Sequence, residues 1–316
     1  MLIINLIMFF LALIVLIIAA YYGVKSLIWL AHALKLSEFV MAFIAGAIAT
    51  SLPELFISIN ASLNKASEIV IGNILGSNIA DIALVAGLII VFARQISTTN
   101  VKIRRDAIWM FLLGSLPLVL FFLGNGLSRI DGALLIFSSF FYMFYIFKIR
   151  KQFKKVLKAR INAKQTFYYT VILITCLALI YFSAHYVVNY AKLLAIDLKI
   201  STLFVALFLI SIGTSLPELA LEIQAIKLKK ASIALGDLLG SVIANSTIIL
   251  GIAALISPIK AELTTIFIAA LFFILAAYLF VTFMHSGKKL LLSEGIALII
   301  VYILFIIVEF YIKTLS

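Results

Sequence analysis

Apolar runs of about twenty residues recur along almost the whole chain, and they limit what it can fold into. A helix that crosses a bilayer needs about 20 mostly apolar residues. Hydrophobic residues make up 65% of the 316 and charged residues 12%, against about 45–50% and about 25% in soluble domains. A water-soluble core cannot bury this excess. The sequence therefore predicts an all-α integral membrane protein.

The apolar runs predict about ten transmembrane helices in two sets of five. The first set lies at about 3–21, 38–62, 67–92, 107–124 and 130–148, and the second at about 166–188, 201–226, 231–256, 262–283 and 291–312. The first run follows Met1 directly and lacks the basic start and cleavage site of a signal peptide, so we expect a spanning helix there. The single cysteine, Cys176, excludes an intramolecular disulfide.

Lysine and arginine residues are divided unevenly between alternate loops. If the N-terminus is outside, 19 of the 25 lie on the inner side and six on the outer side. Cytoplasmic loops carry such an excess, so we expect a cell-membrane protein with both termini outside and the basic linker 149–165 in the cytoplasm. This placement explains the net charge of +12 without a nucleic-acid partner. The linker is interpreted as a topology signal, and binding of anionic lipid is the alternative.

Two motifs occur twice, and every matched pair is 164 positions apart. Thr50-Ser51-Leu52-Pro53-Glu54 returns as Thr214-Ser215-Leu216-Pro217-Glu218, and Gly72-Asn73-Ile74-Leu75-Gly76-Ser77 returns as Gly236-Asp237-Leu238-Leu239-Gly240-Ser241. Five helices separate the copies, and because five is odd they enter the membrane from opposite sides. We therefore predict two inverted five-helix repeats, 1–148 and 166–316, which is typical of secondary transporters with sites near the midplane.

The motifs place polar groups in the middle of hydrophobic spans. Proline removes a backbone donor and clashes with the preceding turn, so we expect broken or kinked helices at Pro53 and Pro217, next to hydroxyl groups and glutamates. Glycines at four-residue spacing in the second motif favour close helix packing. These glycines are Gly72, Gly76, Gly236 and Gly240.

Five acidic residues lie inside the expected helices, with no lysine or arginine at the same depth. They are Glu54, Asp81, Glu218, Glu222 and Asp237. Bare carboxylates are costly in a bilayer, so these must be protonated, hydrated or paired with a cation. Oxygen ligands suit hard cations, above all Ca²⁺ and also Na⁺, and the motifs contain no Cys or His for softer metals. Glu222, whose repeat mate is Ser58, is either a pathway residue or lies near a helix end. Asp237, the mate of Asn73, belongs either to the site or to an access path.

At these residues the sequence resembles the cation/calcium exchanger superfamily, and within it the prokaryotic sodium/calcium exchangers. The resemblance implies transport of Ca²⁺ and Na⁺ without a cofactor. It implies a Ca²⁺ site between Glu54 and Glu218, completed by Thr50 and Thr214. It also implies surrounding Na⁺ sites at Ala47, Ser51, Ser77, Ser211, Ser215 and Ser241. Asp81 and Asn245 match the family's midplane acid and amide positions, although the two types are exchanged between repeats.

Several other functions remain open from the sequence. A Ca²⁺/H⁺ antiporter or a K⁺-coupled antiporter on the same fold is the main alternative, because Glu222 and Asp237 are extra carboxylates. An intramembrane aspartyl protease would use Asp81 and Asp237, but Ala234-Leu235-Gly236-Asp237 departs from the required Gly-x-Gly-Asp. No phosphate-binding loop for an ATP-driven pump is found. An inverted repeat with broken helices favours a carrier over a passive channel, and we expect neither enzymatic activity nor an obligatory protein partner.

Overall fold

The computed structural model describes residues 1–33, 51–149, 163–229, 231–261 and 263–315, and these ranges are helical almost throughout. The α-helices are α1 (Leu2–Ala33), α3 (Leu52–Leu63), α4 (Ser67–Ile79), α5 (Ala86–Ala93), α6 (Val101–Gly124), α7 (Arg129–Ile149), α8 (Ala163–Leu198), α9 (Thr202–Val205), α10 (Ser211–Lys227), α11 (Ala231–Ala244), α12 (Leu250–Ile256), α13 (Leu263–Ser286) and α14 (Leu292–Leu315). Three π-helical segments join neighbouring helices: η2 (Ala80–Val85), η3 (Ala206–Ile210) and η4 (Asn245–Ile249). The strands are β1 (Gln95–Ser97) and β2 (Lys289–Leu291).

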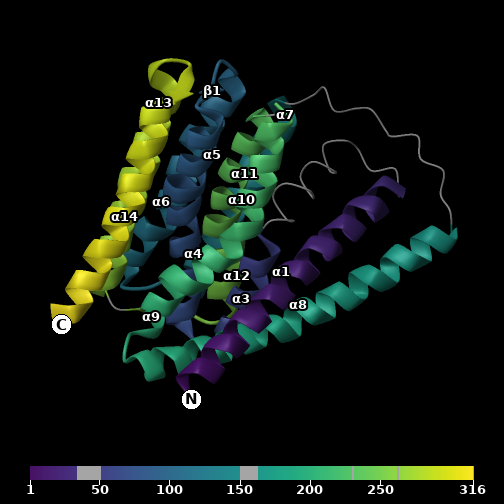
Figure 1. Cartoon of the computed structure of the whole chain (residues 1–316), viewed down its shortest axis with the longest axis vertical. Helices are drawn as coiled ribbons and strands as arrows, with labels where there is room; N and C mark the ends of the chain where they lie inside the picture. The colour runs from purple at the N-terminus through teal and green to yellow at the C-terminus, as the bar shows by residue number, and fades with distance from the viewer. Residues whose placement is uncertain (34–50, 150–162, 230, 262, 316) are drawn as a thin grey trace.

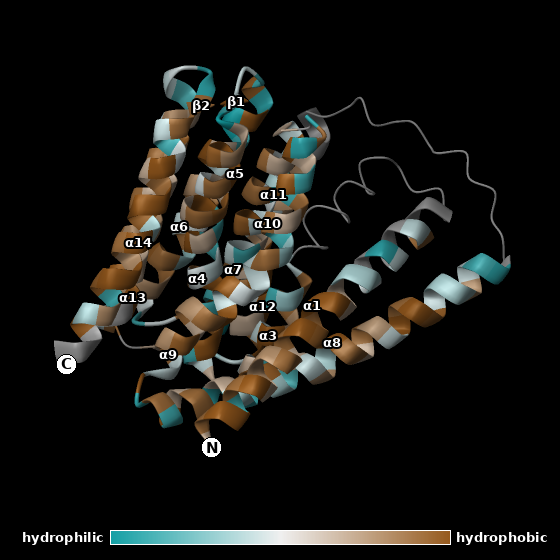
Figure 2. Cartoon of the chain, in the orientation of Figure 1, coloured by the Kyte–Doolittle hydropathy of each residue, from teal (hydrophilic) through white to brown (hydrophobic). Residues whose placement is uncertain are grey.

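Eight spans in the described ranges are long and apolar enough to cross a membrane. The shorter α3 and the 21-residue α7 bring the set to the ten expected helices. The span Ser67–Ala93 is 83% buried, whereas Leu2–Gly23 is 28% buried, so α4–η2–α5 is central and α1 is peripheral. Figure 2 shows apolar residues along most of the helices and polar residues gathered around β1 and β2. The prediction of an all-α, multi-pass membrane protein is confirmed.

Helices α1 and α8 are longer than predicted and pack along one side of the other helices. They contain 32 and 36 residues, or about 48 and 54 Å at 1.5 Å per residue. Because a hydrocarbon core is only about 30 Å thick, such helices are expected to tilt. Figure 1 shows both inclined against the other helices. The prediction ended both helices too early because it treated polar residues near the membrane surface as helix ends.

Helices α1 and α8 pack against each other in opposite directions. Near one end, Asn5 Nδ2 donates to Asp197 Oδ2 at 2.7 Å. Near the other end, the rings of Trp29 and Tyr169 stack with centroids 4.3 Å apart. As one residue number rises the other falls, so the first helices of the two halves are antiparallel, as an inverted repeat requires.

Two short backbone contacts show the same inversion. Strand β1 pairs with β2 in antiparallel register, Gln95 opposite Leu291, and Leu127 forms an isolated antiparallel bridge with Ile259. Shifting the first pair by the repeat offset gives the second, because 95 + 164 is 259 and 291 − 164 is 127. Helices α6 and α13, 24 residues each, run between the two contacts, which places them about 36 Å apart. The contacts are therefore repeat-related and lie at opposite ends of the bundle.

The two prolines take different places in their helices. Pro53 lies in the first turn of α3, after the N-cap residue Ser51, where a missing N–H costs nothing. Helix α10, however, runs through Pro217, so a break there is wrong and the alternative, a kink, stays a prediction. The irregular backbone lies one turn or more upstream, in η3, and in the segments η2 and η4 that follow α4 and α11. Such π-helical turns occur often at functional sites.

Candidate functional site

The two motif glutamates lie in α3 and in α10. Glu54 is in the first turn of α3, where the helix dipole favours negative charge, and Glu218 follows Pro217 in α10. Their side chains are 1% and 2% exposed. Asp81, in η2, is 3% exposed and lies within electrostatic range of Glu54, and Glu218 lies within range of both. The structure thus brings three of the predicted acidic residues together in the buried centre.

Hydroxyl groups of one half face the acidic groups of the other. Ser77 Oγ and Thr214 Oγ1 are 3.3 Å apart and share a hydrogen bond. The Thr214 hydroxyl also lies beside the Glu54 carboxylate, and the Ser215 hydroxyl lies near that of Asp81 without forming a hydrogen bond. Each of these contacts joins a first-half residue to a second-half residue, so the site lies at the interface of the repeats.

Buried oxygen atoms without a hydrogen-bond partner in the described part of the chain occur here in repeat-related pairs. The four pairs, each 164 positions apart, are Ser51 Oγ with Ser215 Oγ, Glu54 Oε2 with Glu218 Oε2, Asn73 Oδ1 with Asp237 Oδ1, and Asp81 Oδ1 with Asn245 Oδ1. Buried polar groups are normally hydrogen-bonded, so these eight atoms in a symmetric set are candidates to bind a proton, water or a cation. Cations coordinated by oxygen would satisfy them.

The donor set fits a hard cation. Across the residues that the structure describes, no three carboxylate, imidazole or thiol groups come close enough to hold a metal between them. A cation between Glu54 and Glu218 would therefore take further ligands from hydroxyl and main-chain oxygens, which is the chemistry of Ca²⁺ and Na⁺. Pro217 supports this supply, because its missing N–H leaves the carbonyl of Gly213 without its helical donor.

The remaining predicted site residues take several different positions. Thr50 and Ala47 lie outside the described residues. Ser241 and Asn245 are buried at 1% exposure each. The Ser211 hydroxyl donates to the Leu207 carbonyl, and the Ser211 carbonyl accepts from Thr214 Oγ1 at 3.1 Å.

Close approach of the predicted glycines is found in the first repeat. A Cβ on Gly72 would lie 2.7 Å from Ala206 Cβ, and one on Gly76 would lie 2.7 Å from Ser211 Oγ. No described atom lies within 4 Å of such a Cβ on Gly236 or Gly240. The segment that the repeat would place against these two glycines, 39–47, is outside the described residues. Packing at Gly236 and Gly240 therefore stays a prediction.

Three further polar residues at the centre were not singled out from the sequence. Asn78 Nδ2 donates to Ser246 Oγ at 2.7 Å, which ties α4 to η4. Tyr302 of α14 is 3% exposed and lies within electrostatic range of Asp81. Asn78 and Ser246 are polar residues in buried spans, a signal that could have identified them. Tyr302 gave no such signal, because tyrosine is common in lipid-facing helices.

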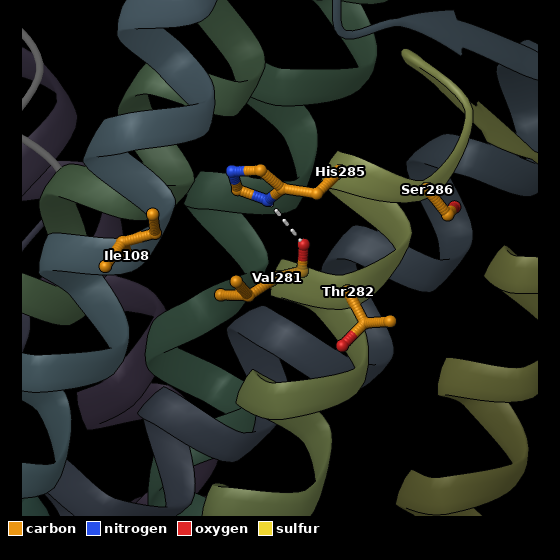
Figure 3. Close-up of a pocket in the computed structure, with 5 residues that line it drawn as sticks. All are labelled: Ile108, Val281, Thr282, His285 and Ser286. Carbon is orange, nitrogen blue, oxygen red and sulfur yellow. Dashed lines mark hydrogen bonds between the residues drawn. The ribbon is translucent and has the colours of Figure 1, made fainter.

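A shallow pocket lies away from these residues, between α6 and the end of α13. It is lined by Ile108, Val281, Thr282, His285 and Ser286, and His285 Nδ1 lies 2.8 Å from the Val281 carbonyl (Figure 3). None of the buried carboxylates lines it.

Comparison with known proteins identifies the family. The family model described as sodium/calcium exchanger protein matches residues 4–148 and 168–311. The chain belongs to this family. One member, the sodium/calcium exchanger MaX1 of Methanosarcina acetivorans, is 30% identical over 99% of this chain and 100% of its own length. Inner membrane protein YrbG of Escherichia coli is 32% identical over 67% of each chain.

Solved structures of a family member also share the fold. A structure of the sodium-calcium exchanger NCX_Mj is 28% identical, covers 97% of this chain and 99% of its own, and superposes with a TM-score of 0.66. At 97% of this chain, the match extends over both halves. Membership in this exchanger family is consistent with transport rather than an enzymatic reaction.

Proposed function

We propose that this chain is a secondary antiporter that exchanges Ca²⁺ for Na⁺ by alternating access. The main support is the symmetric set of buried, unpartnered oxygens around Glu54 and Glu218. Family membership supports the same ions, and the similar proteins MaX1 and NCX_Mj are named sodium/calcium exchangers. The extra acids Glu222 and Asp237 keep a Ca²⁺/H⁺ or K⁺-coupled antiporter as the alternative.

In this proposal Ca²⁺ binds between Glu54 and Glu218, with oxygens of Thr50 and Thr214 completing its shell. Na⁺ ions bind around it and share the same two carboxylates. Their further ligands would come from Ala47, Ser51, Ser77, Ser211, Ser215 and Ser241, with Asp81 and Asn245 at the midplane. Because Ca²⁺ and Na⁺ need the same carboxylates, one ion type leaves as the other binds.

Charge explains why such a site would exchange ions rather than release them one way. No lysine or arginine forms a salt bridge with Glu54, Glu218 or Asp81 within the described ranges. A site with bare carboxylates is costly to enclose at membrane depth, whereas bound Ca²⁺ or Na⁺ neutralises them. Only the transporter with Ca²⁺ or Na⁺ bound would then switch the side of the membrane to which the site opens. The movement of one ion type in one direction is thereby coupled to the movement of the other in the opposite direction.

We further propose that α1 and α8 move together against the remaining helices. They are held to each other along their length by the Asn5–Asp197 and Trp29–Tyr169 contacts. Leu13 of α1 lies directly against Gly213, one residue before Thr214. A displacement of the pair would therefore change what covers one side of the ion site.

The proposed orientation places both termini outside and the linker 149–165 in the cytoplasm. Among the described residues, the basic residues Arg94, Lys227 and Lys288 lie beside or close to β1 and β2, and Lys227 Nζ lies 5.8 Å from the Phe92 ring centroid, next to β1. Both chain ends lie at the opposite end (Figure 1). The excess of basic residues marks the β1–β2 end as the cytoplasmic one.

The test is uptake of ⁴⁵Ca²⁺ into proteoliposomes loaded with Na⁺, with K⁺, or with an acidic interior. Uptake should require internal Na⁺ and should disappear in Glu54→Gln and Glu218→Gln. Uptake driven by the proton gradient alone would replace the proposal with a Ca²⁺/H⁺ antiporter. No uptake under any gradient would refute calcium exchange.

A further inference from the structure

The two halves differ in one pair of buried residues beside the glutamates. In the first half, Asn73 Nδ2 donates to Ser58 Oγ at 3.4 Å and to the Glu54 carbonyl at 3.5 Å. Ser58 and Asn73 are fully buried and both are neutral. One amide therefore supplies the donors that link α3 to α4 beside Glu54.

The second half has two carboxylates at the same places. Adding 164 to Ser58 gives Glu222, and adding 164 to Asn73 gives Asp237. Glu222 is 1% exposed, and it lies within electrostatic range of Asp237. The repeat places Asp237 toward the Glu218 carbonyl, as Asn73 lies toward the Glu54 carbonyl. The amide donor is thus replaced by a group that, when ionised, only accepts.

The oxygens of this pair lack partners. Neither Glu222 Oε2 nor Asp237 Oδ1 has a hydrogen-bond partner among the residues described, and both atoms are buried. The repeat places these two carboxylates beside the Glu218 carbonyl, and unpartnered buried carboxylates are costly unless they are protonated or a positive charge lies between them. Two negative charges and as many as five oxygens match a divalent hard cation.

We propose that Glu222 and Asp237, with the main-chain carbonyl of Glu218, bind a second Ca²⁺ ion, separate from the central site. The proposal rests on the proposed function in one respect, that Ca²⁺ is the transported ion. Asp237 is half-buried, whereas Glu222 is 1% exposed, so Asp237 is the more accessible of the two carboxylates. Ca²⁺ bound there would share Glu218 with the central site, through the main-chain carbonyl in one site and the carboxylate in the other.

The second site lies on one side of the membrane only. Glu222 and Asp237 flank the α10–α11 turn, and Lys227 just before that turn contacts Phe92 beside β1. Ser58 and Asn73 flank the α3–α4 turn, where Ser67 Oγ donates to the Pro258 carbonyl at 3.4 Å, next to the Leu127–Ile259 bridge. The acidic pair therefore lies toward the β1–β2 end, the proposed cytoplasmic side. The neutral pair lies toward the opposite end of the bundle.

Counting bound Ca²⁺ tests the site without relying on transport. The full chain is purified in detergent, and ⁴⁵Ca²⁺ bound at equilibrium is measured in Glu54→Gln, where the proposed central site is disabled. We expect about one Ca²⁺ per chain to remain bound, and to be lost when Glu222→Ser and Asp237→Asn are added. These two substitutions restore the residues of the other half, so the fold already accepts them at equivalent places.

Failure of this inference is distinguishable from failure of the proposed function. No bound Ca²⁺ in Glu54→Gln, or Ca²⁺ that persists after the two added substitutions, overturns the second site even if Na⁺-driven exchange is found. The converse result, a lost Ca²⁺ without any exchange activity, supports the second site and refutes the exchange.

The side of action gives a second measurement. In right-side-out and everted vesicles, Glu222→Ser with Asp237→Asn should raise the KM for Ca²⁺ at least fivefold on the β1–β2 face. The KM on the opposite face should stay unchanged. Equal changes on both faces, or none, contradict a site that serves one side.

Discussion

Two glycines at opposite ends of the bundle have nearly the same surroundings. A Cβ on Gly87 would lie 2.6 Å from Ile299 Cγ1 and 2.9 Å from the Gly295 carbonyl. A Cβ on Gly251 would lie 2.7 Å from Ile136 Cγ1 and 2.8 Å from the Gly132 carbonyl. These are the contacts of α5 with α14 and of α12 with α7, and the second repeats the first. We predict that Gly87→Ala and Gly251→Ala destabilise the protein to the same degree.

The magnitude follows from the overlap. All four contacts are shorter than real Cβ atoms show, and a carbonyl of a packed helix cannot move aside like a flexible side chain. Overpacking of this kind costs about 1–3 kcal/mol at each site, and the two sites are far enough apart for their effects to add. The double variant should therefore lose about 2–6 kcal/mol.

Thermal unfolding in detergent, followed by loss of the monodisperse peak, measures the effect. Gly124→Ala is the matched control, because no described atom lies within 4 Å of a Cβ there. Each single variant should lower Tm by roughly 2–6 °C and the double variant by about twice as much, while the control stays at the wild-type value. A large shift in one single variant and none in the other would refute the repeat-related packing.

Three further predictions concern helix packing, a buried hydrogen bond and ion binding. Gly23→Cys should form a disulfide with the native Cys176 under mild oxidation, because a Cβ on Gly23 would lie 3.2 Å from Cys176 Cβ, close to the roughly 3.5–4.5 Å found in disulfides. The readout is a faster-migrating band on non-reducing gels, which Cys176→Ala should abolish. Ser246→Ala should cost about 1–3 kcal/mol in thermal unfolding, because it leaves the buried Asn78 amide unpaired, and an unchanged Tm would contradict this. In the Glu222→Ser, Asp237→Asn background, which lacks the proposed second site, Ca²⁺ at a hundred times its Kd should stabilise the protein by about 2.7 kcal/mol, and a similar gain after Glu54→Gln is added would exclude the central site as its cause.

The repeat and its buried acids were predictable because their signals are local in the sequence. Pro53 with Glu54 and Pro217 with Glu218 interrupt apolar runs of the sequence. They are 164 positions apart, and this offset, which spans five helices, predicts the inversion without any contact information. The contact of Gln95 with Leu291 and of Leu127 with Ile259 agrees with that offset residue by residue. Topology was predictable because inversion follows from an odd number of helices.

The irregular segments were not predictable because they arise from packing. Helix α10 tolerates Pro217, and the backbone adjusts upstream in η3, where no proline or glycine occurs. Strands β1 and β2 exist only because two loops almost 200 residues apart meet. Tyr302 gave no sign of its place beside Asp81, since burial of an aromatic residue in an apolar helix depends on which face its neighbours cover.

Competition between the two ions at one set of carboxylates is the most direct test of exchange. Binding of ⁴⁵Ca²⁺ to the purified chain is measured at increasing Na⁺, with K⁺ replacing Na⁺ to hold ionic strength constant. The apparent Kd for Ca²⁺ should rise steadily with Na⁺ in the wild type, and Glu218→Gln should lose the Na⁺-sensitive Ca²⁺. Ca²⁺ binding that is indifferent to Na⁺ would contradict a shared site and, with it, exchange of the two ions.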